Sequence, residues 1–194
     1  MTCGVSSNDL QMTLYGEGIQ TYAAMFDGFA AAAERFLKAT EREDPTDSYV
    51  ALFEALNWAV VLDVRTKELW APRGRDRQPG WGWRDEVEGA GVLRGIRFAR
   101  NAMHHDWAEV LELADVGRAY PKRFPAGYRE WVWREIATLP QHGRKDPEGQ
   151  AVYIGELAGH PVRHSLVGLH GGFAFLRSVL EPSSLIAPRA TEGN

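Results

Sequence analysis

Hydrophobic residues recur at steps of three and four positions in four long stretches of the chain, which is the pattern of helices that bury one face. The stretches span about residues 18–42, 48–69, 85–116 and 161–180, and the third is predicted to be the longest helix. The residues expected on the buried faces are, in chain order, Tyr22, Met25, Phe26, Phe29, Ala33, Phe36 and Leu37; Leu52, Phe53, Leu56, Ala59, Val60 and Val64; Val92, Ile96, Ala99, Met103, Val110 and Ala114; and Leu166, Leu169, Phe173, Leu176 and Leu180.

Capping residues and prolines mark the ends of these helices. Thr46 or Asp47 is predicted to cap the second helix, and Pro161 suits the first turn of the last one. The chain between the third and fourth helices is irregular. There, residues 128–137 are expected to form a short strand or hairpin arm, or else a short helix, and residues 152–158 a short helix.

These elements predict an all-α protein, a four-helix bundle with an irregular insertion between helices 3 and 4 that can include a short β element. The 194 residues are enough for one helical domain with its own core, covering residues 1–194. The ends, at about residues 1–15 and 183–194, are expected to be flexible.

Composition narrows the range of functions. The net charge is −4, so the chain is not a globally basic nucleic-acid binder, and any contact with RNA must be local. Cys3 is the only cysteine, which rules out a disulfide framework and favours a reducing compartment. The sequence has neither a signal-peptide pattern nor an apolar run long enough for a membrane span, so a cytoplasmic location without membrane partners is expected.

Some polar residues interrupt the apolar pattern. Asp63 and Arg65, on the second helix, are interpreted as a surface charge pair or a cap, with a contribution to a site as the alternative. The loop at residues 71–84 is rich in glycine, proline and arginine. It is either a solvated connection or a local patch that contacts phosphates and bases. Its arginines are Arg73, Arg75, Arg77 and Arg84.

The richest chemistry lies in the third helix, at residues 97–107. Arg100 and His104 are four residues apart and share a helix face, as do Asn101 and His105. Arg100 and His105 are separated by about 140° around the axis, so one straight helix does not easily bring them to one small group. Two copies of the helix across a twofold axis would do so more easily.

Other catalytic chemistries have little support. His104 and His105 are adjacent and lack an H-E-x-x-H pattern, and His160 precedes Pro161 and is expected outside the helix that carries His164. No nucleophile elbow or phosphate-binding loop occurs in the sequence. No metal or other cofactor is therefore predicted.

The motif Arg100-Asn101 followed by His105, on the third helix of a bundle, resembles the motif of the HEPN superfamily, which is an arginine, four to six residues, and a histidine. Residues 93–101 and 157–166 are also similar to segments of HEPN-like proteins, mostly actinobacterial or from phages. The resemblance implies a metal-independent endoribonuclease of a toxin or defence type, a homodimer with RNA as its substrate and an antitoxin protein as a partner.

In such enzymes the histidine handles protons while the ribose 2′-hydroxyl attacks the adjacent phosphate. A histidine side chain titrates near neutral pH, and an arginine stays charged and stabilises negative charge on phosphate oxygens. The candidate catalytic residues are Arg100, Asn101, His105 and His104, and the candidate substrate-binding residues are Arg94 and Arg97.

The alternative is a non-catalytic HEPN-like helical module for dimerisation or interaction. In that case Arg100, Asn101 and His105 make interfacial hydrogen bonds, and exposed Trp131 and Trp133 engage a partner.

Overall fold

The computed structural model describes residues 7–42, 44–70, 82–105, 109–115, 129–139 and 146–180, with side chains from residue 22 onward. Within these ranges the chain is mostly helical and has one small sheet, which confirms the all-α class. The elements are α1 (Ser7–Glu41), α2 (Pro45–Leu69), α3 (Trp83–Glu86), α4 (Leu93–His105), β1 (Leu111–Asp115), β2 (Arg129–Trp133), a 3-10 turn (Ile136–Thr138), α5 (Pro147–Val152), a π-helical turn (Tyr153–Leu157) and α6 (Val162–Leu180).

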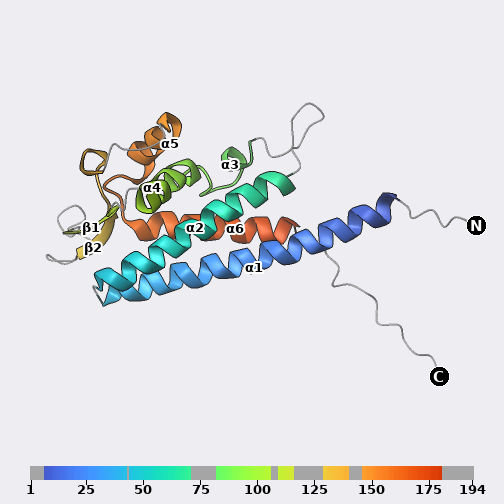
Figure 1. The fold of residues 1–194 in the computed structure, drawn as a ribbon, viewed down its shortest axis with the longest axis horizontal. Helices are drawn as coiled ribbons and strands as arrows, with labels where there is room; N and C mark the ends of the chain where they lie inside the picture. The colour runs from blue at the N-terminus through green and yellow to red at the C-terminus, as the bar shows by residue number, and fades with distance from the viewer. Residues whose placement is uncertain are drawn as a thin grey trace, which may run out of the picture.

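The long helices α1 and α2 pack side by side, and α6 packs against both (Figure 1). The shorter helices α4 and α5 lie on the other side of α2 from α1. The two strands lie near the end of the molecule where α1 turns into α2. Helix α4, which carries the predicted site, therefore lies against α2 on one flank and α5 on another.

Helices α1, α2 and α6 bury the apolar faces that the sequence predicts. Phe29 of α1 meets Phe173 of α6 edge to face, with ring centroids 5.3 Å apart, and both rings are buried. Val64 is the exception, because it is 47% exposed rather than on the buried face of α2. Helix α1 begins at Ser7 rather than near residue 18, whereas residues 1–6 and 181–194, at the predicted flexible ends, lie outside the described residues.

Helix α2 is capped by Asp44, not by Thr46 or Asp47. The Asp44 carboxylate accepts hydrogen bonds from the backbone N–H groups of both of these residues at 3.0 Å. Pro45 occupies the first turn, where its missing N–H costs no hydrogen bond. The helix therefore begins a turn earlier than expected.

The predicted third helix, at residues 85–116, is wrong in its extent. The chain turns at Gly89, which has a φ of +80°, and α4 begins only at Leu93. A Cβ atom on Gly89 would lie 2.3 Å from the Gly168 carbonyl oxygen of α6, so a glycine is required at this close approach. At the other end α4 stops at His105, and residues 111–115 form β1 instead.

The segment predicted as a strand or a helix is a strand. β2 pairs antiparallel with β1, so that Trp131 lies opposite Leu113 and Trp133 opposite Leu111. Trp133 is fully buried, and its indole N–H donates to Ser165 Oγ at 3.0 Å. The long-range pairing stabilises an extended conformation that local helix propensity does not predict.

A glycine lets α4 approach the π-helical turn closely. A Cβ atom on Gly95 would lie 3.0 Å from the backbone nitrogen of Tyr153 and 3.0 Å from Leu157 Cδ1. Gly149 of α5 has the same role on the other side of the contact, since its Cβ would lie 3.0 Å from the Arg94 carbonyl oxygen. These contacts fix α5 beside the first turn of α4.

We expect Gly95→Ala to lower the free energy of unfolding by about 1–3 kcal/mol, because the added methyl group meets backbone that has no room to move. Gly171→Ala on α6 is the matched control. Its Cβ would meet nothing within 4 Å, so the higher helix propensity of alanine should stabilise the protein by about 0.5–1 kcal/mol. Urea unfolding of both variants measures the difference, and two changes of the same sign would contradict the packing argument.

Candidate functional site

The rotation of α4 is set by its apolar face. Leu93, Ile96, Ala99 and Met103 are buried in the core, and this leaves the polar residues of the helix on its other side. Arg97, Arg100 and Asn101 are half-buried, while His104 and His105 are exposed in the last turn. The polar side of α4 therefore faces partly toward α2 and partly toward solvent.

Helix α2 contacts α4 through polar and aromatic pairs, and the two helices run antiparallel at this contact. Phe53 stacks on His104 with ring centroids 6.1 Å apart, and further along α2 Asn57 binds Arg100. The sequence analysis did not assign Asn57 to the site. Its partner lies 43 residues away, so no local pattern identifies the pair.

Arg100 is held in place by two amide groups. Its Nε–H donates to Asn57 Oδ1 at 2.9 Å, and its Nη1 donates to Asn101 Oδ1 at 3.2 Å. A guanidinium has five N–H donors, so donors remain for a ligand. Asn101 thus orients Arg100.

The two histidine rings are in contact. Their rings meet edge to face, with centroids 4.9 Å apart and an angle of 74° between the planes. His104 is fixed between this contact and the ring of Phe53, whereas His105 is on the outer side. One end of α4 therefore presents an oriented arginine and two solvent-facing imidazoles.

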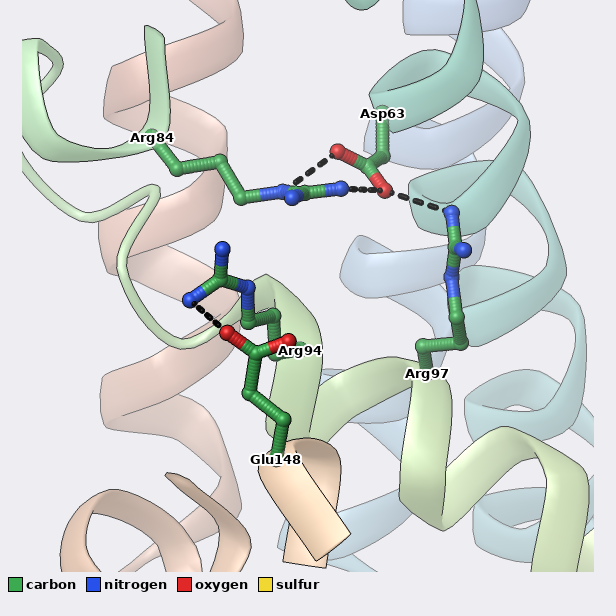
Figure 2. A network of polar contacts seen from close by, with 5 residues as sticks. All are labelled: Asp63, Arg84, Arg94, Arg97 and Glu148. Carbon is green, nitrogen blue, oxygen red and sulfur yellow. Dashed lines mark hydrogen bonds and ion pairs between the residues drawn. The ribbon is translucent and has the colours of Figure 1, made fainter. Parts of the chain in front are cut away.

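The other end of the α4 polar side is an arginine cluster around a buried carboxylate (Figure 2). Asp63 is only 1% exposed and accepts from Arg84 Nε at 2.8 Å and Arg84 Nη2 at 2.6 Å, a bidentate contact. Arg97 Nη2 donates to the same carboxylate at 2.8 Å. The surface pair of Asp63 with Arg65 is a wrong prediction, because Arg65 binds Glu68 at 2.7 Å instead.

Arg94 lies beside this cluster and binds Glu148 of α5 through a contact of 2.6 Å between Nη1 and Oε1. Together the three arginines line a pocket of about 170 Å³, which we call the arginine pocket. It is lined by Arg84, Arg94, Arg97, Asp146, Glu148 and Gly149. Asp146 also caps α5, since its Oδ1 accepts from the Gly149 N–H at 2.9 Å.

The predicted site residues therefore separate into two groups along α4. Arg100, Asn101, His104 and His105 lie together in the last two turns. Arg94 and Arg97 belong to the arginine pocket nearer the start of the helix. The ion pair between Asp63 and Arg84 was not predicted from the sequence. The available signal was a single carboxylate inside the apolar run at residues 59–64.

Among the described residues no group of three or more His, Cys, Asp and Glu side chains is placed to hold a metal ion. No described helix has the length and apolar character needed to cross a membrane. The residues Arg73, Arg75 and Arg77 of the predicted arginine loop lie outside the described residues.

Comparison of the chain with protein-family models, with curated proteins and with solved structures returned no match in any of the three.

We expect Asp63→Asn to lower the free energy of unfolding by about 1–3 kcal/mol, because the two guanidinium groups lose their shared anion. Glu54→Gln is the matched control, since Glu54 also binds an arginine, Arg35, but both side chains are exposed. Glu54→Gln should change the free energy of unfolding by no more than about 0.5 kcal/mol. Equal losses in the two variants, measured by urea unfolding, would show that burial of the Asp63 network adds nothing.

Proposed function

We propose that the chain is a HEPN-like, metal-independent endoribonuclease that acts on RNA as a homodimer. The observation that carries the proposal is the placement of a fixed arginine and a solvent-facing histidine on one helix. Arg100 is oriented by Asn57 and Asn101, and His105 is exposed in the next turn. These are the two residue types that cleavage of RNA through its own 2′-hydroxyl requires.

In this mechanism the ribose 2′-oxygen forms a bond to the adjacent phosphorus, and the bond from phosphorus to the 5′-oxygen breaks. His105 accepts the proton of the 2′-hydroxyl, and the leaving 5′-oxygen takes a proton from His104 or from water. Arg100 donates hydrogen bonds to the phosphate oxygens as negative charge builds on them. Asn57 and Asn101 keep the guanidinium in one orientation, which lowers the cost of ordering it.

The directions of the two side chains support the homodimer of this proposal. Arg100 is turned toward α2, whereas His105 is exposed on the outer side of α4. A second copy of α4 across a twofold axis would bring the histidine of one chain to the arginine of the other. A toxin or defence role, with an antitoxin protein as a partner, belongs to the same proposal.

A second candidate function is a non-catalytic helical interaction module. Exposed apolar residues on α6 favour it, namely Val167, Phe175 and Val179. The aromatic pair expected to engage a partner does not support it, because Trp133 is fully buried and Trp131 is half-buried. Cleavage of RNA needs the more specific chemistry, an oriented arginine and a histidine on one helix.

We expect the purified protein to cleave single-stranded RNA in the presence of EDTA. His105→Ala should slow the reaction about 10²–10⁴-fold and Arg100→Ala about 10²-fold or more, because each removes a group that acts in the transition state. His164→Ala is the control, since His164 is an exposed histidine on α6. No cleavage by the unchanged protein over a broad set of RNAs, or equal rates in all variants, would reject the proposal.

The proposal that each site takes Arg100 from one chain and His105 from the other can be tested separately. Mixing inactive Arg100→Ala chains with inactive His105→Ala chains should restore about one quarter of the activity, because half of the dimers are mixed and each mixed dimer has one intact pair of residues. Activity is measured after the chains have exchanged. If both residues of a site came from the same chain, no activity would return.

A further inference from the structure

We propose that the arginine pocket binds a terminal phosphate group, the phosphate monoester at the end of an RNA strand. The RNA strand rests on the proposed function, but the affinity for the phosphate monoester itself does not. Three arginines, Arg84, Arg94 and Arg97, line this one pocket. In Figure 2 the first and third are directed at Asp63, and Arg94 is directed at Glu148. The three arginines come from α3 and from two successive turns of α4.

The carboxylate bound to two of the lining arginines is outnumbered by them in charge. Asp63 carries one negative charge and is bound by two arginines, Arg84 and Arg97. Because Asp63 is buried, it fixes both guanidinium groups before any ligand arrives. Each guanidinium uses only some of its five donors on Asp63, so further N–H groups are available for an oxyanion.

One lining residue, Glu148, is an exchangeable carboxylate. Glu148 binds Arg94, but the side chains are 67% and 45% exposed. An ion pair this exposed contributes only about 0–1 kcal/mol. The Glu148 carboxylate thus binds Arg94 only weakly. A phosphate group carries more charge and can replace it there.

Asp146 limits the affinity and the choice of ligand. Its carboxylate lines the pocket while it caps α5, so the pocket with Glu148 displaced has three arginines against Asp63 and Asp146. A phosphate monoester carries about −1.5 to −2 charges at pH 7 and three strong acceptor oxygens. An internal phosphodiester carries only one negative charge. A terminal phosphate is therefore attracted more strongly by the excess of positive charge in the pocket.

The size of the pocket points to the same ligand. Pockets that enclose a whole organic ligand have about 300–1,000 Å³, whereas this one has about 170 Å³. It has room for one phosphate group and leaves a nucleobase outside. The ligand is therefore the end of a chain rather than a buried nucleotide.

The test uses isothermal titration of the full chain with inorganic phosphate. Glu148→Gln should tighten phosphate binding about twofold to fivefold, because the competing carboxylate is gone. Glu54→Gln is the matched control, since it also removes one negative charge from an arginine ion pair but lies outside the pocket. Arg94→Ala should weaken binding about tenfold or more, with thermal unfolding as the check that the variant is folded.

A second arm uses one RNA sequence with a 5′-phosphate, a 3′-phosphate or hydroxyl groups at both ends. An RNA with a terminal phosphate should bind more tightly than the hydroxyl form, and inorganic phosphate should compete with it. No phosphate binding at millimolar concentration, equal tightening in both glutamine variants, or equal binding of the three RNAs would overturn the inference. Phosphate binding without RNA cleavage would instead reject the nuclease proposal and leave the phosphate site standing.

Discussion

The burial of Asp63 is the constraint on which the arrangement around α4 depends. A carboxylate that is 1% exposed needs compensating charge close by, and Arg65, the nearest arginine on α2, binds Glu68 instead. The compensation comes from Arg84 and Arg97, which lie 21 and 34 residues further along the chain. A packing that moved α3 or α4 away from α2 would remove one of the two arginines, and one that moved both would leave the carboxylate unpaired. The network therefore specifies which segments pack on α2, in addition to whatever stability it contributes.

Two close backbone approaches complete the placement of α4. The turn at Gly89 comes against α6, and Gly95 lets the helix lie on the π-helical turn that follows α5. The first contact requires a positive φ and the second requires the absence of a side chain. The second approach, together with that of Gly149 to the Arg94 carbonyl oxygen, brings Glu148 within reach of Arg94, so the arginine pocket depends on close backbone packing next to its own side chains.

Hydrophobic periodicity in the sequence predicted the long helices. The apolar stripes identified most of α1, α2 and α6, since a buried helix face repeats over many turns. The same reasoning failed for residues 111–115, which continue a helical pattern but pair with β2, a partner that local sequence does not reveal. For the site, periodicity placed Arg100 and His105 in different directions, as the structure does. It did not identify Asn57 or Asp63, because their importance comes from partners on another helix.

The two groups of polar residues on α4 differ in whether their side chains are bound within the protein or exposed to solvent. Arg97 is bound to a buried anion, whereas His105 is exposed. Arg94 and His105 are eleven residues apart, which is about 16 Å along a helix axis. The proposed binding site at one end and the proposed catalytic residues at the other are therefore separated by a rigid spacer. An RNA end held in the arginine pocket would place a scissile phosphate at a set distance, because a helix, unlike a loop, keeps that distance constant.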